Sequence, residues 1–292
     1  MRTDLKAHLL LSLTVVLWAV NFIALKVIYK TVEPPGLALL RLLAVSVFFL
    51  VLAKLRKEEL RYPPGLAPRI LFQGFLAFGL YMVLFLEGLN KTSPAVTAIL
   101  MAAAPIVTAL ISVVLKTEKF RPGLFVGAVC AFVGVGMTMM SSAAKGDIVG
   151  EVLVLTSAFV WAISVNVLRP VLTEISPFRA MTLSLPGAYL ALVPYGIMKL
   201  IQTPWHAQTP AWWLMFGHVS LLSSGVAFVT YYAGIQLLGT GRAVMYHFFV
   251  PPLTVLLGFA VLGTPMVPMQ WVGMAVIIGG VAYALRKPAE TA

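Results

Sequence analysis

Residues 242–286 read RAVMYHFFVPPLTVLLGFAVLGTPMVPMQWVGMAVIIGGVAYALR, and no Asp, Glu, Lys or Arg lies between the two arginines. A helix needs about 20 apolar residues to cross about 30 Å of hydrocarbon. The uncharged stretch is long enough for two crossings. The sequence therefore predicts two membrane-spanning helices here, over residues 241–262 and 267–285.

The same pattern extends toward the N-terminus. Residues 200–241 form a second long uncharged run, and shorter runs cover 92–115, 122–144 and 180–198. Across the chain 60% of the residues are hydrophobic and 11% are charged, which is too little charge to cover a soluble protein of this size. We therefore predict an all-α integral membrane protein with ten transmembrane helices. The expected spans are residues 7–28, 34–53, 69–89, 93–115, 122–142, 150–168, 178–198, 213–237, 241–262 and 267–285.

The basic residues indicate which side of the membrane each loop faces. With ten spans, 15 of the 21 Lys and Arg residues fall on the side that holds both termini, and five fall on the opposite side. Short cytoplasmic loops carry the excess of Lys and Arg in membrane proteins. Both termini are therefore predicted to be cytoplasmic. The net charge of +11 belongs to these loops beside the lipid bilayer, so it does not indicate a nucleic-acid partner.

The chain contains an internal repeat. A shift of 146 positions aligns Gly79 with Gly225, Gly88 with Gly234, Pro105 with Pro251, Pro122 with Pro268, Gly127 with Gly273 and Gly134 with Gly280. A shift of 143 aligns earlier residues, including Trp18 with Trp161. Because each half holds five helices, an odd number, the second half must enter the membrane from the opposite face. We predict two inverted five-helix repeats, residues 1–145 and 146–292, as in alternating-access transporters.

Two aligned prolines mark a candidate site in the middle of the membrane. A proline in a helix removes a backbone donor and frees the carbonyl four residues earlier. Pro105 would free that of Met101, and Pro251 that of His247, which the repeat also aligns. We predict that Pro105 and Pro251 are hinges beside a central cavity. The competing interpretation is that they only bend the helices for packing.

Aromatic and small polar residues gather at the same depth. Rings with a polar tip suit a solute that has an apolar body and a few hydrogen-bonding groups. His247 is interpreted either as a neutral hydrogen-bonding residue or as a proton-coupling group. The predicted substrate-binding residues are Trp18, Asn21, Tyr81, Met101, Trp161, Ser164, Tyr231, Tyr246 and His247.

Two charged positions within the spans need partners. Arg41 lies about one-third of the way into its span, where an unpaired charge is costly, so we expect a carbonyl or a carboxylate beside it. Glu87 and Lys91 are one helical turn apart at the outer end of a span, which favours a local ion pair. Glu87 is also the best candidate for an intramembrane proton carrier.

The sequence contains no recognisable catalytic or metal-binding motif. The four histidines have no ligand spacing, and the two aspartates, Asp4 and Asp147, both lie at span ends. Cys130 lies within an apolar stretch and is expected to be a small buried hydrophobe. We expect no metal and no cofactor. A membrane-embedded transferase would need convergent carboxylates or an activated nucleophile, so it is a less favoured alternative.

Several short motifs occur in a duplicated order. They are Trp18-Ala-x-Asn21-Phe22, Pro34-x(6)-Arg41, Ser93-x(11)-Pro105, Gly127-x(6)-Gly134 and Gly273-x(5)-Gly279-Gly280. With them the chain resembles the drug/metabolite transporter superfamily, specifically its EamA-type ten-helix exporters, along essentially its whole length. It departs from that family where span four usually ends in Gly-Glu. The first half reads Lys116-Thr117-Glu118 there, and the second half reads Gly263-Thr264-Pro265.

The resemblance implies export of small metabolites such as amino acids, with exporters of the YddG kind as the nearest subfamily. It also implies a central cavity lined by spans one, three, four, six, eight and nine. We predict a neutral or zwitterionic small-molecule substrate and a multi-pass protein of the cell membrane, here a bacterial inner membrane. Nucleotide-sugar or sugar-phosphate exchange is the alternative, although phosphates should require Lys or Arg at mid-membrane. No feature assigns an oligomeric state, and a monomer fits them all.

Overall fold

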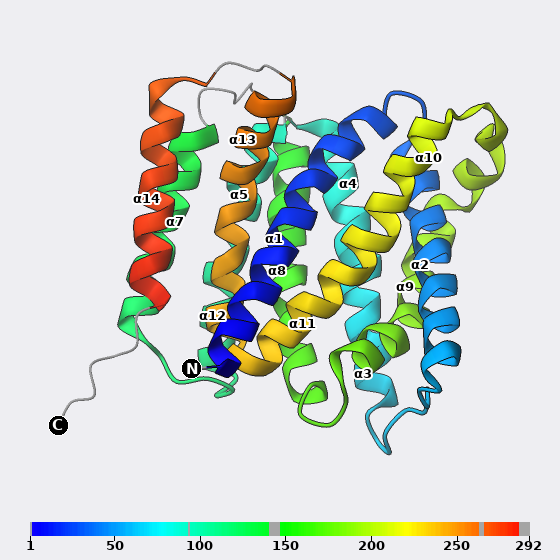
Figure 1. The fold of residues 1–292 in the computed structure, drawn as a ribbon, viewed down its shortest axis with the longest axis horizontal. Coiled ribbons are helices and arrows are strands. Elements are labelled where there is room, and N and C mark those ends of the chain that lie inside the picture. The colour runs from blue at the N-terminus through cyan, green and yellow to red at the C-terminus, as the bar shows by residue number, and fades with distance from the viewer. Residues whose placement is uncertain (1, 93, 140–146, 263–265, 286–292) are drawn as a thin grey trace.

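The computed structural model describes residues 2–92, 94–139, 147–262 and 266–285. Throughout these ranges the regular secondary structure is helical, and no strand occurs in them. Figure 1 shows the helices running between an upper and a lower edge of the molecule. Helix α1 (Arg2–Ile28) begins at the lower edge, and α14 (Pro268–Leu285) ends there.

The prediction of an all-α chain made for a membrane agrees with this architecture. Nine helical stretches of the described chain are long and apolar enough to cross a bilayer, and a further apolar stretch, Ile99–Val114, is shorter and contains the break between α5 and α6. The remaining α-helices are α2 (Pro34–Arg56), α3 (Ala67–Gly74), α4 (Tyr81–Lys91), α5 (Pro94–Met101), α6 (Ala104–Val114), α7 (Pro122–Met139), α8 (Ile148–Val171), α9 (Pro177–Gln202), α10 (Pro210–Gly217), α11 (Ala227–Leu238), α12 (Thr240–Val244) and α13 (Val250–Leu262).

Prolines and polar caps explain where many of these helices begin. Helices α2, α5, α7, α9, α10 and α14 each start with a proline, whose fixed φ and missing N–H suit the first helical turn. Side chains cap other free donors: Asp147 accepts a hydrogen bond from the N–H of Val149 (3.0 Å), and Thr209 accepts one from Trp212 (3.2 Å). Because these prolines and capping residues lie at the helix starts themselves, those starts could be predicted from the sequence.

Spans three and eight contain matched π-helical segments. Residues Phe75–Leu80 lie between α3 and α4, and residues His218–Val226 lie between α10 and α11. A shift of 146 places 75–80 on 221–226, inside the second segment. Because π-helical turns are rare and occur frequently at functional sites, their duplication indicates a role common to both halves.

The stretches predicted as spans four and nine are interrupted at the two predicted hinges. Helix α5 ends at Met101 and α6 begins one residue before Pro105. In the second half a 3-10 segment, Met245–Phe249, precedes α13, which begins one residue before Pro251. The carbonyl of His247, which Pro251 leaves free, accepts a hydrogen bond from the N–H of Val250 instead. The helices are thus broken at equivalent places, while their movement during transport stays a prediction.

Helices α7 and α14 lie side by side and pack through glycines (Figure 1). A methyl group added at Gly127 would collide with the backbone carbonyl of Gly280, and one added at Gly134 would collide with that of Gly273. The repeat aligns Gly127 with Gly273 and Gly134 with Gly280. The 146 shift therefore converts one contact into the other. Both contacts allow α7 and α14 to approach closely, as small residues permit for helices in membranes.

A second pair of contacts has the same reciprocity. A methyl group at Gly88 of α4 would collide with Val154 of α8, and one at Gly234 of α11 would collide with Leu11 of α1. The 146 shift aligns the glycines, and the 143 shift aligns Leu11 with Val154. Equivalent helices of the two halves are therefore packed in equivalent ways.

The glycine packing leads to a stability prediction. Gly134→Val should lower the free energy of unfolding by about 1–3 kcal/mol, because the added carbons overfill the α7–α14 contact. Gly136→Val is the matched control on the same helix, since nothing lies within 4 Å of a methyl group at Gly136. The measurement is the thermal unfolding temperature of the detergent-purified protein. Equal losses in the two variants would contradict the proposed contact.

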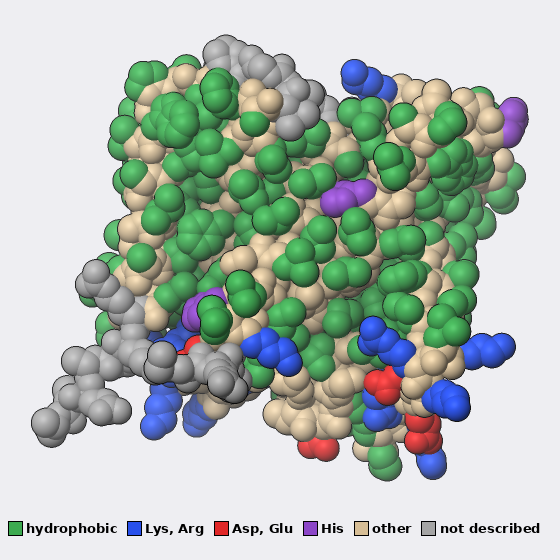
Figure 2. Space-filling model, viewed as in Figure 1, with side chains coloured by type: hydrophobic (Ala, Val, Ile, Leu, Met, Phe, Trp, Pro, Cys, Tyr) green, Lys and Arg blue, Asp and Glu red, His purple; other side chains and the backbone are tan. Residues whose placement is uncertain are grey.

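The surface between the two edges is apolar. Figure 2 shows hydrophobic side chains covering most of this face, while most of the visible Lys and Arg residues gather along the lower edge. Cys130 of α7 is exposed, so the expectation that it is buried was wrong. Hydrocarbon is as apolar as a protein core, and apolar sequence therefore does not tell a lipid-facing position from a buried one.

Candidate functional site

Five of the predicted binding residues come together in the interior, and we call them the ring cluster: Trp18, Tyr81, Trp161, Tyr231 and His247. The Trp18 ring centroid lies 4.9 Å from that of His247 and 5.4 Å from that of Tyr231. Trp161 lies 5.7 Å from His247 and 5.2 Å from Tyr81. These separations are within the range of favourable ring contacts. The cluster draws on α1, α4, α8, α11 and the 3-10 segment before α13.

The irregular segments position the rings. The indole N–H of Trp18 donates to the backbone carbonyl of Ser223, which lies in the π-helical segment 218–226 (3.2 Å). Tyr81 is the first α-helical residue after the π-helical segment 75–80. His247 lies in the 3-10 segment, with Nδ1 3.2 Å from the carbonyl oxygen of Val244. An Nδ1–H donated to that carbonyl leaves Nε2 available to accept a hydrogen bond.

One hydroxyl of the cluster has an unused hydrogen-bonding capacity. Trp161 and Tyr231 are 5% and 1% exposed, whereas Trp18, Tyr81 and His247 are half-buried. The Tyr231 hydroxyl is buried and has no hydrogen-bond partner among the described residues. Leaving such a group unpaired costs about 1–3 kcal/mol. A solute with a polar group would satisfy it while its apolar part contacts the rings.

Ser164 and Tyr246, which were also predicted to bind substrate, lie outside the ring cluster. Ser164 is buried, and its hydroxyl donates to the carbonyl of Trp161 in its own helix (2.7 Å). Tyr246 is hydrogen-bonded through its hydroxyl to His8 of α1. Adjacent helical residues point in different directions, so Tyr246 contacts His8 whereas His247 contacts the ring cluster.

Met101 and Asn21 are likewise engaged elsewhere. The Ser157 hydroxyl donates to the Met101 sulfur (3.4 Å), which ties α5 to α8. The side-chain oxygen of Asn21 accepts a long hydrogen bond from the guanidinium group of Arg41 (3.5 Å). Asn21 therefore supplies a side-chain carbonyl, which is one of the two kinds of partner expected for Arg41.

Glu87 and Lys91 do not form the predicted ion pair. Among the residues that the structure describes, the one ion pair joins Lys199 to Glu33, with 2.7 Å between nitrogen and oxygen. Lys91 is exposed, and an exposed pair of this kind gains little energy. The Glu87 carboxyl lies next to the hydroxyl of Tyr195 on α9 instead. That contact crosses between helices, so spacing along one helix could not predict it.

Phe228 belongs beside the ring cluster although it was not predicted. Its ring centroid lies 5.4 Å from that of Trp18, 5.8 Å from that of Trp161 and 4.8 Å from that of Phe78. It precedes Tyr231 by three residues on α11, a spacing that places the two side chains on one helix face. This spacing is the signal that could have identified it.

Glu118 joins the two halves near the lower edge of the molecule. Its carboxylate oxygens accept hydrogen bonds from the N–H groups of Thr240 (2.5 Å) and Gly241 (3.0 Å), at the start of α12. A carboxylate satisfies the free donors and the partial positive charge of a helix N-terminus. The sequence offered only a departure from a motif here, because the partners lie more than a hundred positions away.

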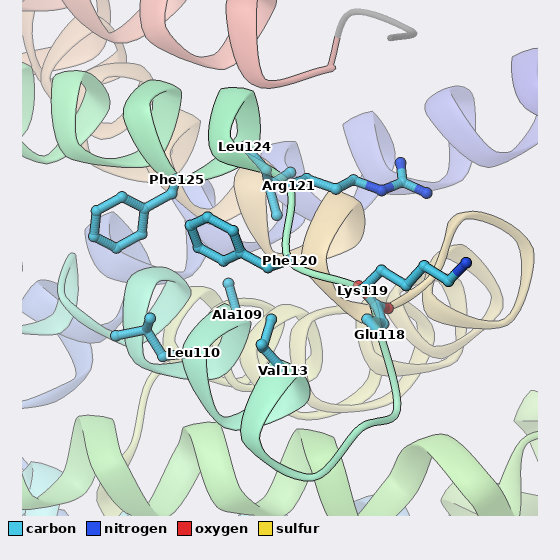
Figure 3. Close-up of a pocket in the computed structure, with 9 residues that line it drawn as sticks. All are labelled: Ala109, Leu110, Val113, Glu118, Lys119, Phe120, Arg121, Leu124 and Phe125. Atoms are coloured by element: carbon cyan, nitrogen blue, oxygen red, sulfur yellow. The ribbon is translucent and has the colours of Figure 1, made fainter. Parts of the chain in front are cut away.

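A pocket adjoins Glu118 at the hairpin between α6 and α7. Figure 3 shows Phe120 and Phe125 on one side of it, with Lys119 and Arg121 extending away from these rings. The other lining residues are Ala109, Leu110, Val113 and Leu124. None of its lining residues belongs to the ring cluster, so this pocket is separate from the predicted central site.

The ring cluster provides groups for binding. It offers aromatic faces, one imidazole and one free hydroxyl, which together can hold a partly apolar solute by ring contacts and a few hydrogen bonds. Within the described ranges, no three His, Cys, Asp or Glu side chains are grouped so that they could hold a metal ion.

Comparison with known families matches both halves of the chain. The model of the EamA-like transporter family covers residues 5–140 and again residues 148–286. The chain belongs to the EamA-like transporter family. The resemblance inferred from the short motifs is therefore confirmed.

Relatives of this EamA-like chain are named as transporters. A probable terminal-alkyne amino-acid exporter of Streptantibioticus cattleyicolor is 25% identical over 288 residues, which cover 97% of this chain and 94% of that protein. The uncharacterized inner membrane transporter YedA of Escherichia coli is 24% identical over 269 residues, 90% of this chain and 85% of that protein. An uncharacterized transporter of Archaeoglobus fulgidus is 26% identical over 292 residues, 97% and 98% of the two chains. The EamA-like chain is thus a multi-pass membrane protein of a transporter family.

A solved crystal structure has the same fold as this EamA-like protein. The two superimpose with a TM-score of 0.80 over 96% of each chain, at 19% sequence identity. At that identity the likeness extends to the fold alone.

Proposed function

We propose that this protein exports a small, partly apolar metabolite, an amino acid or a related neutral or zwitterionic compound, by alternating access. The observation that carries the proposal is the ring cluster, to which both halves contribute beside matched helix breaks. Trp18 and Tyr81 come from the first half, whereas Trp161, Tyr231 and His247 come from the second. A site built between two repeats is accessible from either side when the repeats rock against each other.

The proposal includes ten spans arranged as two inverted repeats, residues 1–145 and 146–292. The reciprocal glycine contacts support it, because a two-fold relation between the halves makes each close contact occur twice. The double match to one family supports the duplication. A tenth span over α5 and α6 would be divided by the break before Pro105, and a broken helix is tolerated where protein rather than lipid surrounds it.

We propose that both termini are cytoplasmic, and labelling tests this. In a Cys130→Ser background, Lys57→Cys and Lys119→Cys should resist an impermeant maleimide added to intact cells, whereas Lys30→Cys should react. All three positions are exposed. We expect this labelling pattern because cytoplasmic loops carry the excess of basic residues. Outside labelling of Lys57→Cys would contradict both the orientation and the count of spans before it.

The relative named as a probable terminal-alkyne amino-acid exporter makes amino acids the first compounds to test. Purified protein should take up at least one amino acid into proteoliposomes faster than protein-free liposomes do. Any proton coupling would be assigned to Glu87 beside Tyr195 or to His247 in the ring cluster, the two intramembrane candidates. Uptake at the protein-free rate for the whole panel would count against the proposed substrate class.

A further inference from the structure

Arg41 is a buried cation whose partners are all neutral. It lies on α2 and is 8% exposed. One terminal nitrogen, Nη2, donates to the Ser224 hydroxyl (2.7 Å), to the Val219 carbonyl (3.0 Å) and, at longer range, to Asn21. The guanidinium group therefore has hydrogen bonds but no neutralising charge from these three residues.

No carboxylate that the structure describes compensates the charge either. Among the described residues, no Asp or Glu forms an ion pair with Arg41. The ionisable groups that lie near it are the phenols of Tyr29 and Tyr81 and the imidazole of His218, none of which carries a negative charge at neutral pH. A buried cation without a counter-ion costs several kcal/mol, and such residues in membrane proteins mark functional sites.

The fold itself does not require a cation at this place. A shift of 143, which aligns the prolines that begin α2 and α9, aligns Arg41 with Ser184. Ser184 is fully buried and bonds the carbonyl of Ala180 in its own helix (2.7 Å). Helix α9 thus occupies the equivalent position of the second half with a neutral side chain. Packing alone therefore leaves the charge of Arg41 unexplained.

Donors of the guanidinium group remain free. Nε is buried without a hydrogen-bond partner, and Nη1 donates to no described residue, because all three hydrogen bonds use Nη2. A carboxylate has two oxygens that can accept from such donors, in charge-assisted hydrogen bonds about twice as strong as neutral ones. Arginine has the fork geometry that suits this group.

The surroundings of Arg41 suit a ligand that is apolar beyond one anionic group. Arg41 and Ser224 are the polar residues of a pocket whose remaining lining is apolar and includes Leu42, Phe78 and Met181. Tyr81, whose ring contacts Trp161 of the ring cluster, also lies near Arg41. An elongated solute could therefore contact both the cation and the rings.

We propose that Arg41 binds the carboxylate of the transported solute, so that the substrates are apolar monocarboxylates, including zwitterionic ones, held by Arg41 and the ring cluster. This inference rests on the proposed transport function and specifies its substrates. Among the Lys and Arg side chains that the structure describes, Arg41 alone is buried. A single cation matches one carboxylate, whereas a diphosphate group would demand several.

The test compares three matched probes: L-leucine, 4-methylpentanoate, which lacks the amine, and L-leucinamide, which lacks the carboxylate charge. Apparent Kd values come from the ligand-dependent rise in unfolding temperature of the purified full-length protein. For the wild type, the two carboxylates should bind about tenfold or more tightly than the amide, because the amide offers the guanidinium group one neutral acceptor oxygen instead of two charged ones. Arg41→Gln should reduce this preference to about twofold or less.

Two further variants serve as references. Arg41→Lys keeps the charge and should retain most of the preference, and Arg179→Gln removes an arginine at the membrane edge and should leave it unchanged. Arg179 bonds the carbonyl of Arg61 in a loop (2.8 Å) and does not line the pocket. If Arg41→Gln does not fold, the wild-type comparison of leucine with leucinamide still decides, since equal or tighter amide binding overturns the proposal.

Other outcomes also overturn it. These are an unchanged carboxylate preference in Arg41→Gln, no binding of any probe to the wild type, or an equal Arg41-dependent shift with sodium chloride alone, which would assign Arg41 to an inorganic anion. Failure of the wider transport function is distinguishable. In that case the wild type moves no amino acid in proteoliposomes, while the binding comparison still reports on Arg41.

Discussion

Trp161→Ala should lower kcat/KM for the transported solute about 30-fold or more in proteoliposomes. The indole contacts all four other members of the ring cluster and Phe228, so its removal disrupts the ring contacts of the whole cluster. Loss of about 2–3 kcal/mol of ring contact corresponds to a factor of that size. His247→Ala should also impair transport, because it removes both a ring and a hydrogen-bonding nitrogen.

Controls for Trp161→Ala separate binding from folding. Truncating a buried tryptophan costs about 3–5 kcal/mol of stability, so the variant must be shown to elute and melt as a folded protein. Trp161→Phe keeps an aromatic ring and should recover part of the activity. Trp271→Ala is the matched control, since Trp271 is 52% exposed on α14. Unchanged transport by folded Trp161→Ala and His247→Ala would show that the solute passes elsewhere.

Pro105→Ala and Pro251→Ala should bias the protein toward opposite faces of the membrane. Each proline follows a break in its helix, and alanine would restore a backbone donor and favour a continuous helix at that point. The two breaks occupy equivalent positions in halves of proposed opposite orientation. A stiffened helix in one half should therefore favour one face, and the same change in the other half should favour the opposite face.

Accessibility of buried cysteines measures this bias. Val244 lies in α12, the helix whose first residues bond Glu118, and Phe85 lies on α4 near Glu87. Val244→Cys and Phe85→Cys replace side chains that are buried. The ratio of their labelling rates should change about fivefold in opposite directions in the two proline variants, for a bias of about 1 kcal/mol. The double variant should return toward the wild-type ratio. Pro186→Ala, within the unbroken helix α9, should change nothing.

Parallel shifts in the two proline variants would contradict the paired-hinge mechanism. So would unchanged labelling in both variants with transport intact, in which case the prolines serve packing alone. Because the comparison uses a ratio within each variant, a general loss of stability does not imitate opposite shifts.

The helices could be predicted because charges and prolines mark their ends. The expected span 34–53 corresponds to α2, which starts at Pro34 and continues to Arg56, and the expected span 178–198 corresponds to α9, from Pro177 to Gln202. The aligned helix breaks were also readable, since proline acts on the backbone within its own turn. Local chemistry of this kind needs no knowledge of the tertiary structure.

Contacts between helices could not be read in the same way. The π-helical segments have no local signal, and two of the three partners of Arg41, Val219 and Ser224, come from the other half of the chain. Ser164 lies on the same helix face as Trp161, yet its hydroxyl bonds the backbone, which competes with any ligand. Depth and spacing thus identified five ring residues, whereas the assignment of polar partners required the packed structure.

Counterflow in proteoliposomes tests the central claim most directly, namely that one site serves both faces of the membrane in turn. Liposomes loaded with an unlabelled amino acid are diluted into a trace of the same labelled compound. For at least one amino acid the label should transiently accumulate above its equilibrium level, and Trp161→Ala should abolish this overshoot. Simple equilibration of every compound without overshoot, at the rate of protein-free liposomes or of a channel, would contradict it.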